Sequence, residues 1–500
     1  MTGAGQPLTT VVVPTLGRPS LCALLDALGG GTRHLDVPVL VVDDRRSPSA
    51  PLGLPDRGLD VRLLNSGGGG PARARNLGWR HSRTPWVSFL DDDVVPEPDW
   101  FERLLEDLRG ARSDVAGVQG RLRVPLPETR RPTDWERGTA GLETSWWITA
   151  DLSYRREALS AVGGFDERFH RAFREDADLG LRITESRGRI VPGGRAVQHP
   201  VRPADTWASV RQQQGNADDF LMQALHGPAW RHRAHVPRGR RRAHFATAGA
   251  AVAAVLARAG GARRAASVAA AVWAAGTAQF AVRRIAPGPR DRAEVTRMVL
   301  TSALIPFAAS WHSLRGWAGH RGELPWRGAP DLVLFDRDGT LIHDVPYTGD
   351  PETVRPMPGA RTAVDRLRAE GIRVGMVTNQ SAVAAGTVTR AQVDAVNQRV
   401  EHLLGRFDAV EVCPHQSSDR CGCRKPAPGM VKSACAALGV QPSRCVVVGD
   451  IGSDVEAAEA AGAVGILVPT ESTRREEVTR ADRVLPDLPT AAAHLLRGDW

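Results

Sequence analysis

Short apolar runs that end in polar turns recur through the first half of this chain. Residues 11–13, 39–42 and 87–90 are rich in β-branched or aromatic side chains, and a turn of polar residues follows each of them. The stretch 21–28 has the apolar spacing of a helix and separates the first two runs. Strands that alternate with helices are typical of a parallel α/β sheet. We therefore expect an α/β domain in residues 1–227.

The same alternation returns near the C-terminus. Apolar runs at residues 332–335, 372–377, 409–412 and 445–448 each have the length of a short buried strand. Each of these runs leads into acidic, hydroxyl, amide or cysteine side chains. This pattern predicts a second α/β domain with a parallel sheet in residues 329–500.

Residues 228–328, between the two predicted domains, have a different character. A basic run at 231–244 precedes an Ala-rich, helix-forming segment that continues to residue 314. Its stretches 265–282 and 298–314 approach the roughly 17–20 residues that a membrane-spanning helix needs, although alanine adds little insertion energy. Two interpretations follow: a helical connector packed on the first domain, or a membrane-associated segment at residues 245–314.

Charge and cysteine content narrow the choice of partners and compartment. The net charge is +9, but only Lys425 and Lys432 are lysines, which is typical of an arginine-rich coding bias. No basic platform rich in aromatic residues is present, so we expect no nucleic acid partner. Three of the six cysteines lie between residues 413 and 423, which favours a metal site over disulfides. Residues 1–10 lack the features of a signal peptide, and we expect a cytoplasmic protein.

Candidate chemistry in the second domain begins at the end of its first strand. Asp336 and Asp338 are two residues apart and project to the same side before Gly339 lets the chain turn. Such a pair suits a nucleophile and a proton carrier acting on one phosphate. Later strand ends add further polar groups of the kind that a phosphoryl-transfer site needs. These groups are Thr378, Asn379, Arg424, Lys425 and Asp450.

A second metal is indicated by the cysteine cluster. Cys413 and His415 form one pair of ligands, and Cys421 and Cys423 form another after a gap of five residues. A set of three thiolates and one imidazole is a closed tetrahedral set that suits a structural Zn²⁺ ion.

In the first domain, acidic residues again follow the strands. Asp43 and Asp44 come after the second run, and Asp91, Asp92 and Asp93 come after the third. Asp91 and Asp93 share one face and offer the hard oxygen ligands that Mg²⁺ or Mn²⁺ prefers when it bridges nucleotide phosphates.

Two helix starts add to this candidate site. A glycine run at residues 67–70 opens a helix that carries Arg75 and Asn76, where backbone amides and arginines could meet a diphosphate. Glu175 and Asp176 open another helix, and a carboxylate there could act as general base for an acceptor hydroxyl.

These motifs, in this order over residues 9–227, resemble a family 2 glycosyltransferase with the A-type fold. The resemblance implies that Asp43 or Asp44 contacts the nucleobase or ribose, that Asp91 and Asp93 bind the metal, and that Asp176 or Glu175 is the base of an inverting transfer. Where such enzymes often have an aromatic residue and Asn, this chain has Leu16-Gly17-Arg18. The implied nucleotide-sugar contacts are Pro14, Thr15, Asp43, Asp44, Arg75, Asn76 and Asp92.

Residues 330–496 resemble the haloacid dehalogenase phosphatase superfamily. The resemblance implies that Asp336 attacks phosphorus and forms an aspartyl-phosphate, while Asp338 protonates the leaving oxygen and then activates water. Mg²⁺ would be held by Asp336, by the backbone carbonyl of Asp338 and by Asp450, and Thr378 and Lys425 would bind the phosphoryl group. A zinc loop followed by Arg-Lys-Pro is similar to heptose bisphosphate 7-phosphatases and histidinol-phosphate phosphatases. No large cap domain is evident, so a small phosphorylated metabolite fits.

Together these resemblances imply two Rossmann-like α/β domains joined by an Ala-rich helical segment. We expect a bifunctional carbohydrate enzyme that hydrolyses a sugar phosphate, D-glycero-D-manno-heptose 1,7-bisphosphate, and transfers a sugar from a nucleotide-sugar donor to an acceptor that the sequence does not identify. The alternative is a histidinol-phosphate-type phosphatase with a non-catalytic, sugar-binding module. Peripheral contact with a membrane through the middle segment stays open.

Overall fold

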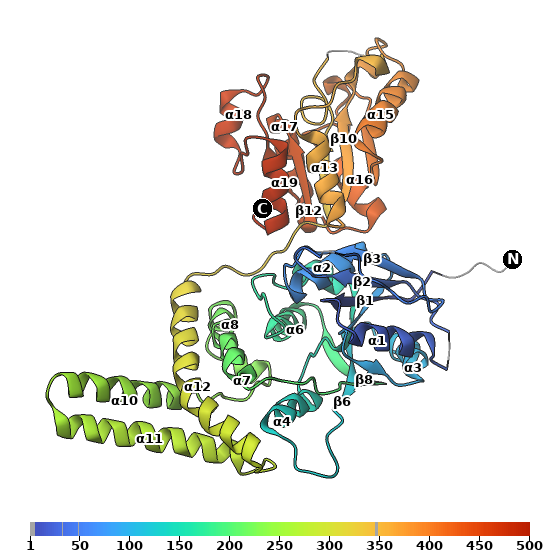
Figure 1. Ribbon diagram of the computed structural model, residues 1–500. Helices are drawn as coiled ribbons and strands as arrows, with labels where there is room; N and C mark the ends of the chain where they lie inside the picture. The colour runs from blue at the N-terminus through green and yellow to red at the C-terminus, as the bar shows by residue number, and fades with distance from the viewer. Residues whose placement is uncertain (1–5, 33, 49, 346–348) are drawn as a thin grey trace. The chain divides into compact units, whose positions relative to one another are not determined.

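The computed structural model describes residues 6–500 except residues 33, 49 and 346–348 (Figure 1). Residues 1–5, which belong to the stretch searched for a signal peptide, therefore lie outside the described residues. The chain forms two compact units. The first contains Met1–Ala158 and Phe165–Pro325, and the second contains Leu159–Gly164 and Trp326–Trp500.

The first unit is built on a sheet with the strand order β3-β2-β1-β4-β7-β6-β8-β5. Strands β3, β2, β1 and β4 are mutually parallel, as the sequence predicts, but β7 runs antiparallel to both β4 and β6. The sheet is therefore mixed, with a parallel half. Its strands are β1 (Thr9–Thr15), β2 (Val39–Asp43), β3 (Val61–Asn65), β4 (Trp86–Leu90), β5 (Val95–Pro96), β6 (Val115–Arg123), β7 (Asp151–Arg155) and β8 (Arg189–Gln198).

Helices cover this sheet because their apolar spacing matches one face of a helix. Helix α1 buries Leu21, Leu24, Leu25 and Leu28 in the same core cluster as alternate residues of β1 and β2. Helix α2 packs so closely on β1 that a Cβ at Gly78 would lie 2.3 Å from Val12 Cγ1, so this position requires glycine. The helices that precede the Ala-rich segment are α1 (Ser20–Gly29), α2 (Pro71–His81), α3 (Trp100–Arg109), α4 (Asp134–Ala140), α5 (Arg156–Val162), α6 (Glu175–Ser186), α7 (Ala208–Arg211), α8 (Asp218–His226) and α9 (Trp230–Arg233), and the end of α5 belongs to the second unit.

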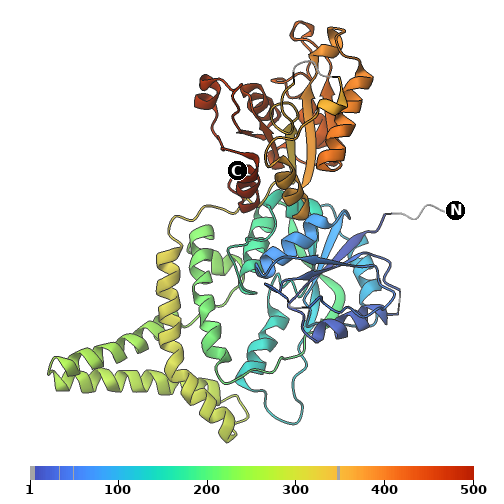
Figure 2. The same cartoon turned by 45° about the horizontal axis from the view of Figure 1, so that its top comes forward.

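The Ala-rich segment folds into three long helices of the first unit: α10 (Arg241–Ala259), α11 (Arg263–Ile285) and α12 (Arg292–Gly319). Helices α10 and α11 form an antiparallel hairpin, and they run side by side in both Figure 1 and Figure 2. Helix α12 packs on α7, on α8 and on the 3-10 helix Gln212–Asn216. Within the described residues, α11 is the one helix long and apolar enough to cross a membrane, which by itself is weak evidence.

The second unit has a five-stranded sheet of order β11-β10-β9-β12-β13, and all of its strand pairs are parallel. The strands are β9 (Leu332–Asp336), β10 (Arg373–Asn379), β11 (Ala409–Cys413), β12 (Cys445–Gly449) and β13 (Val464–Leu467). The helices are α13 (Ala360–Ala369), α14 (Ser381–Ala384), α15 (Arg390–Leu404), α16 (Gly429–Leu438), α17 (Gly452–Ala461), α18 (Arg475–Arg480) and α19 (Leu488–Arg497).

Strand β9 is the centre of this sheet and is buried on both faces. Val333 and Phe335 join a core cluster with α13, α15 and α19, whereas Leu332 and Leu334 join a separate cluster with α16 and α17. Because β9 lies between β10 and β12, its last residue, Asp336, ends beside the carboxyl ends of both neighbours. The fold thus gathers the polar strand ends at one edge.

Candidate active sites

Lys425 lies at the centre of the site in the second unit. Its Nζ contacts the Asp336 carboxylate, lies 2.6 Å from Asp454 Oδ1 and donates to the Val377 carbonyl oxygen at 3.2 Å. Burial raises the pKa of Asp336 well above its usual range, and the Lys425 charge opposes that shift. Burial alone would lower the pKa of Lys425, but the attraction of Asp336 and Asp454 outweighs it and raises the pKa.

Three buried carboxylates surround this lysine and form a candidate metal centre. Oxygens of Asp336, Asp450 and Asp454 all lie within 4.8 Å of one another. Burial, followed by the nearby Asp454 charge, raises the pKa of Asp450 to about 6. One lysine does not balance three carboxylates, and an all-oxygen set fits a hard divalent cation such as Mg²⁺. The sequence predicted Asp336 and Asp450 as ligands but did not assign Asp454, which lies in the first turn of α17.

The Asp338 carboxylate is not one of the three in the candidate metal centre. Two side chains that were not predicted as site residues, Arg337 and Gln380, hold it in place. Arg337 donates to its two carboxylate oxygens at 3.0 and 2.9 Å, and Gln380 Nε2 donates at 2.7 Å. Arg337 is itself fixed by Asn397 Oδ1 at 2.9 Å. Thr378 Oγ1 lies 3.5 Å from the same carboxylate. No local pattern pointed to Asn397, which lies on α15, 59 residues after Asp338.

The turn between Asp338 and Thr340 requires glycine. Gly339 has a φ of +81°, and a Cβ there would lie 2.3 Å from Asp450 Oδ2. The close approach lets Thr340 Oγ1 lie 3.4 Å from Asp450 Oδ1. This turn therefore joins the end of β9 to the end of β12.

The four predicted zinc ligands come together in one loop. The Cys413 Sγ–Cys421 Sγ distance is 3.7 Å, the Cys423 Sγ atom lies 3.4 Å from Cys413 Sγ and 3.5 Å from Cys421 Sγ, and His415 Nδ1 is 3.3 Å from Cys423 Sγ. The edge of a tetrahedron around zinc with Zn–S bonds of about 2.3 Å is about 3.7 Å. The donor set therefore fits a tetrahedral Zn²⁺ ion.

Hydrogen bonds between side chains and the backbone position Arg424 and Lys425, which follow this loop. The Asn379 side chain accepts from the Lys425 amide at 3.1 Å and donates to the Lys425 carbonyl oxygen at 3.2 Å. Arg424 Nη1 donates to the His415 carbonyl oxygen at 3.1 Å. Asn379, predicted to contact phosphate, thus clamps the segment that carries Lys425.

In the first unit, Arg75 connects three of the predicted acidic residues. It donates to Asp91 Oδ1 at 2.8 Å and to Glu175 Oε1 at 3.0 Å, and it lies 3.8 Å from Asp176 Oδ1. One cation facing three carboxyl groups leaves an excess of negative charge. Burial, together with the Asp176 charge, accordingly raises the pKa of Glu175 to about 8 despite the Arg75 contact. Thr149, unpredicted, donates to Asp176 through its amide and hydroxyl at 3.1 and 2.7 Å.

Asp92 and Asp93 have different surroundings. Asp92 accepts from Thr15 Oγ1 at 2.7 Å and from Arg18 Nη1 at 3.0 Å, which ties the end of β4 to the loop after β1. Asp93 lies 3.5 Å from His199 Nε2 and contacts Arg202. Burial and the Asp91 charge raise the pKa of Asp93. His199 and Arg202 were not predicted because β8, the strand that immediately precedes them, has no clear strand pattern.

The remaining predicted residues organise loops. Asp43 accepts from Arg45, whose Nη2 lies 2.7 Å from Oδ2. Asp44 accepts from Ser66 Oγ at 2.6 Å and from the Gly70 amide at 3.0 Å, so it tethers the glycine run. Pro14 pairs with Val42 in the β1–β2 register.

The Asn76 side chain makes its hydrogen bonds to other residues of the protein. Its Nδ2 donates to the Phe165 carbonyl oxygen and to Glu167 Oε1, both at 2.8 Å, and its Oδ1 accepts from Trp79 Nε1 at 2.9 Å. It has no exposed surface. The structure therefore does not bring Asn76 together with the acidic cluster around Arg75.

Comparisons with known proteins match the two parts of the chain to two different families. Residues 10–177 match the model of glycosyl transferase family 2, and residues 347–462 match that of the haloacid dehalogenase-like hydrolases. The chain is 33% identical over 175 residues to a D-glycero-beta-D-manno-heptose-1,7-bisphosphate 7-phosphatase of Bordetella bronchiseptica, covering 33% of this chain and 98% of that protein. It is 36% identical over 136 residues to a D-glycero-alpha-D-manno-heptose-1,7-bisphosphate 7-phosphatase of Mycobacterium tuberculosis, covering 25% and 70%.

A solved structure is also similar: the D,D-heptose 1.7-bisphosphate phosphatase from B. bronchiseptica complexed with magnesium and phosphate. It is 32% identical, with a TM-score of 0.31, and the match covers 33% of this chain and 98% of that one. The chain belongs to the haloacid dehalogenase-like hydrolases through its second unit and carries a glycosyl transferase family 2 domain in its first, and is thus an enzyme of the phosphatase and glycosyltransferase classes.

Proposed function

We propose that residues 329–500 remove the 7-phosphate of D-glycero-D-manno-heptose 1,7-bisphosphate. The names of the similar proteins support the substrate. The observation that carries the chemistry is the arrangement of Asp336 beside Lys425, with Asp338 held apart by Arg337 and Gln380. A nucleophile next to a buried cation and a separate proton carrier are the two parts that stepwise phosphoryl transfer needs.

The reaction proceeds in two steps. A carboxylate oxygen of Asp336 attacks phosphorus, the bond from phosphorus to the 7-oxygen breaks, and Asp338 donates a proton to that oxygen. Asp338, now ionised, takes a proton from water, which attacks the aspartyl-phosphate and releases inorganic phosphate and free Asp336. Lys425 and Thr378 hold the phosphoryl oxygens. A Mg²⁺ ion bound by Asp336, Asp450 and the Asp338 carbonyl oxygen, with Asp454 adjoining, would neutralise the charge on the phosphoryl group.

The substrate is tested by measuring phosphate release from both anomers of the heptose bisphosphate and from histidinol phosphate, with the full chain. The relatives' names include both anomers, so both are compared. We expect at least about a hundredfold preference in kcat/KM for one heptose bisphosphate over histidinol phosphate, and Asp336→Asn should remove all turnover. Faster turnover of histidinol phosphate would refute the assignment in favour of the alternative phosphatase.

We propose further that Cys413, His415, Cys421 and Cys423 hold a structural Zn²⁺ ion. Their spacing and their distances support this, and the loop leads directly to Lys425. Elemental analysis should find one zinc per chain in the parent and none in Cys423→Ser, whose melting temperature should fall. Cys22→Ser, at an exposed cysteine outside the cluster, is the control. Equal zinc content in Cys423→Ser and the parent would contradict the site.

We propose that residues 1–227 transfer a sugar from a nucleotide-sugar donor with inversion, and that residues 228–328 are a helical extension of this domain. Asp91 and Asp93 would hold Mg²⁺ or Mn²⁺ at the donor phosphates, and Asp43 or Asp44 would contact the nucleoside. The charge balance around Arg75 supports a metal, because the acidic cluster lacks enough cations of its own. The bound ion would neutralise the leaving diphosphate.

Asp176 fits the role of general base better than Glu175. The Asp176 side chain is 17% exposed and the Glu175 side chain only 2%, so an acceptor hydroxyl reaches the former more readily. Burial raises the pKa of Asp176, which favours proton uptake. Asp176 would take the proton of the acceptor hydroxyl as that oxygen attacks the anomeric carbon.

A thermal-shift screen of nucleotide sugars with Mn²⁺ identifies the donor, and product analysis then tests transfer. We expect Asp93→Ala to remove transfer or donor hydrolysis while the fold stays intact by circular dichroism. If the parent binds a sugar but neither hydrolyses nor transfers any donor, the first domain is a non-catalytic binding module.

A further inference from the structure

Apolar side chains of the α10–α11 hairpin lie uncovered. Between residues 249 and 280, all of which the structure describes, Ala266 is the only buried residue. A helix that is apolar on all sides is normally enclosed by a protein core or by a membrane, yet only 11% of the most apolar stretch of α11 is buried. The large exposed side chains are 52–68% exposed: Val252, Val255, Leu256, Val268 and Val272.

Helix α12 adds a second uncovered face. One side of α12 is buried against the first unit through Met298, Ile305 and Ala309. Other large apolar residues recur at intervals of four, three, four and three, which places them on a common face. These residues are Leu300, Leu304, Phe307, Trp311 and Leu314, and they are 37–64% exposed. Trp317, 53% exposed, follows one turn later. Exposed tryptophans at the edge of an apolar surface are typical of proteins that contact a membrane–water interface.

The charge of this region points to the chemistry of its partner. Residues 220–290 contain twelve arginines and no aspartate or glutamate. On the hairpin, these arginines lie at both ends: at residues 241 and 242, around the turn at 258–264, and at 283 and 284. The helices between them have 19 and 23 residues, or about 29 and 35 Å. The hydrocarbon core of a bilayer is about 30 Å thick.

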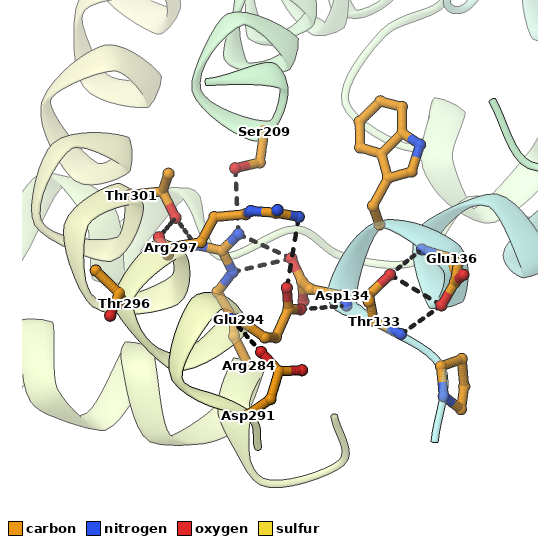
Figure 3. A network of polar contacts seen from close by, with 12 residues as sticks. Thr133, Asp134, Glu136, Ser209, Arg284, Asp291, Glu294, Thr296, Arg297 and Thr301 are labelled. Atoms are coloured by element: carbon orange, nitrogen blue, oxygen red, sulfur yellow. Dashed lines mark hydrogen bonds and ion pairs between the residues drawn. The ribbon is translucent and has the colours of Figure 1, made fainter. Parts of the chain in front are cut away.

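The three helices, called the helical arm below (residues 241–319), are fixed to the transferase domain by a buried polar network (Figure 3). Arg284 at the end of α11 donates to Asp134 Oδ2 of α4 through Nη2 and Nε at 2.8 and 3.0 Å. The same guanidinium donates to Thr301 Oγ1 of α12 at 2.8 Å, and the Asp134 amide donates to Glu294 Oε1 at 2.9 Å. A partner that binds the arm therefore holds the first unit as well.

We propose that the helical arm docks on a lipid bilayer that contains anionic lipids. Its exposed valines, leucines and tryptophans enter the apolar phase, and its arginines pair with the headgroups. A second copy that packed hairpin on hairpin would bring arginine against arginine, because residues 241–285 contain no aspartate or glutamate to pair with them. A nucleic acid would meet the arginines but would leave the apolar faces exposed. The proposal is independent of which sugar the first domain transfers.

Flotation of the full chain with vesicles tests the proposal. We expect strong binding to phosphatidylcholine vesicles that contain phosphatidylglycerol, and weaker binding to phosphatidylcholine alone. Leu256→Glu, at a side chain 66% exposed, should lower the apparent affinity for the anionic vesicles at least about tenfold, because a carboxylate would enter the apolar phase. The matched control is Leu324→Glu, the same change at a 78% exposed leucine outside the arm, which should bind like the parent.

Removal of charge at the hairpin turn tests the electrostatic part. The double change Arg263→Ser and Arg264→Ser should weaken binding to the anionic vesicles about tenfold or more, and leave binding to neutral ones unchanged. The proposal is overturned if the parent floats with neither vesicle, or if Leu324→Glu loses as much affinity as Leu256→Glu. A dimer in light scattering that Leu256→Glu dissociates, without vesicle binding, would assign the surface to a second copy instead.

Discussion

Lys425 supplies a buried positive charge to the phosphatase site. Its Nζ contacts Asp336 and Asp454, and the Asp450 carboxylate completes the cluster. We predict that Lys425→Met lowers kcat/KM for phosphate release at least about a hundredfold, because a charge that stabilises the phosphoryl group is lost. Added Mg²⁺ should also raise the melting temperature of the variant more than that of the parent, since the cation then meets three uncompensated carboxylates.

The only other lysine of the chain supplies the control. Lys432 is exposed on α16, so Lys432→Met should keep the activity and the Mg²⁺ response of the parent. If Lys425→Met kept full turnover, Lys425 would be a structural counter-charge alone.

The raised pKa of Glu175 predicts that the stability of the transferase domain depends on pH. This pKa rises from the ordinary value of 4.5 to about 8 in the folded chain. The folded state therefore holds this proton where the unfolded state has lost it, and stability falls as the pH rises from below 4.5 through 8. Glu175→Gln, which is always neutral, should therefore gain about 2–3 kcal/mol of stability relative to the parent between pH 6 and pH 9.

Thermal melting in EDTA at both pH values checks this prediction, because a bound cation would shift the balance. Asp114→Asn, at an exposed acidic residue of the same unit, is the control and should not reproduce the effect. Equal pH dependence in Glu175→Gln and the parent would mean that Glu175 is ionised at neutral pH.

At the scale of elements, Arg284 connects α11, α12 and α4. It is buried, and its guanidinium bonds Asp134, Thr301 and Ser302. We predict that Arg284→Met destabilises the contact of the helical arm with the first unit by about 2–4 kcal/mol, because the ion pair between Arg284 and Asp134 is lost. Hydrogen exchange should accelerate in α4, in the end of α11 and in the start of α12.

Arg283→Met is the matched control for this network. Arg283 is the preceding residue on α11 and is exposed, so its replacement should leave hydrogen exchange in all three helices unchanged. Similar acceleration in both variants would show that helix propensity, and not the buried ion pair, holds the arm.

At the scale of the whole molecule, the two active-site candidates lie in separate compact units with separate cores. We predict that Asp336→Asn abolishes phosphate release and leaves glycosyl transfer within about twofold of the parent. Asp93→Ala should do the reverse. Kinetic assays of both reactions on each variant check the prediction, and a joint loss in either variant, with the fold intact, would indicate energetic coupling between the units.

The two α/β units and most of their strand ends follow from local patterns in the amino-acid sequence. The apolar runs before Asp336, Thr378 and Asp91 are confirmed as β9, β10 and β4. These features could be predicted because the apolar pattern of a strand and the polar residue that ends it are neighbours in the chain. The same locality made the four spaced zinc ligands recognisable, although their role stays a prediction.

Which side chains contact one another depends on how the elements pack in three dimensions. Arg75 was expected at a diphosphate, yet it is buried among Asp91, Glu175 and Asp176, which are up to 101 residues away in sequence. The antiparallel strand β7 was missed because it is short and has only two apolar residues. The long strand β8, which leads to His199, was missed because a proline and two glycines interrupt its pattern. The exposure of the helical arm could not be predicted from the sequence either, because an apolar helix has the same sequence pattern whether or not a protein core covers it. Local patterns therefore set the elements, whereas long-range packing set their partners, charges and uncovered faces.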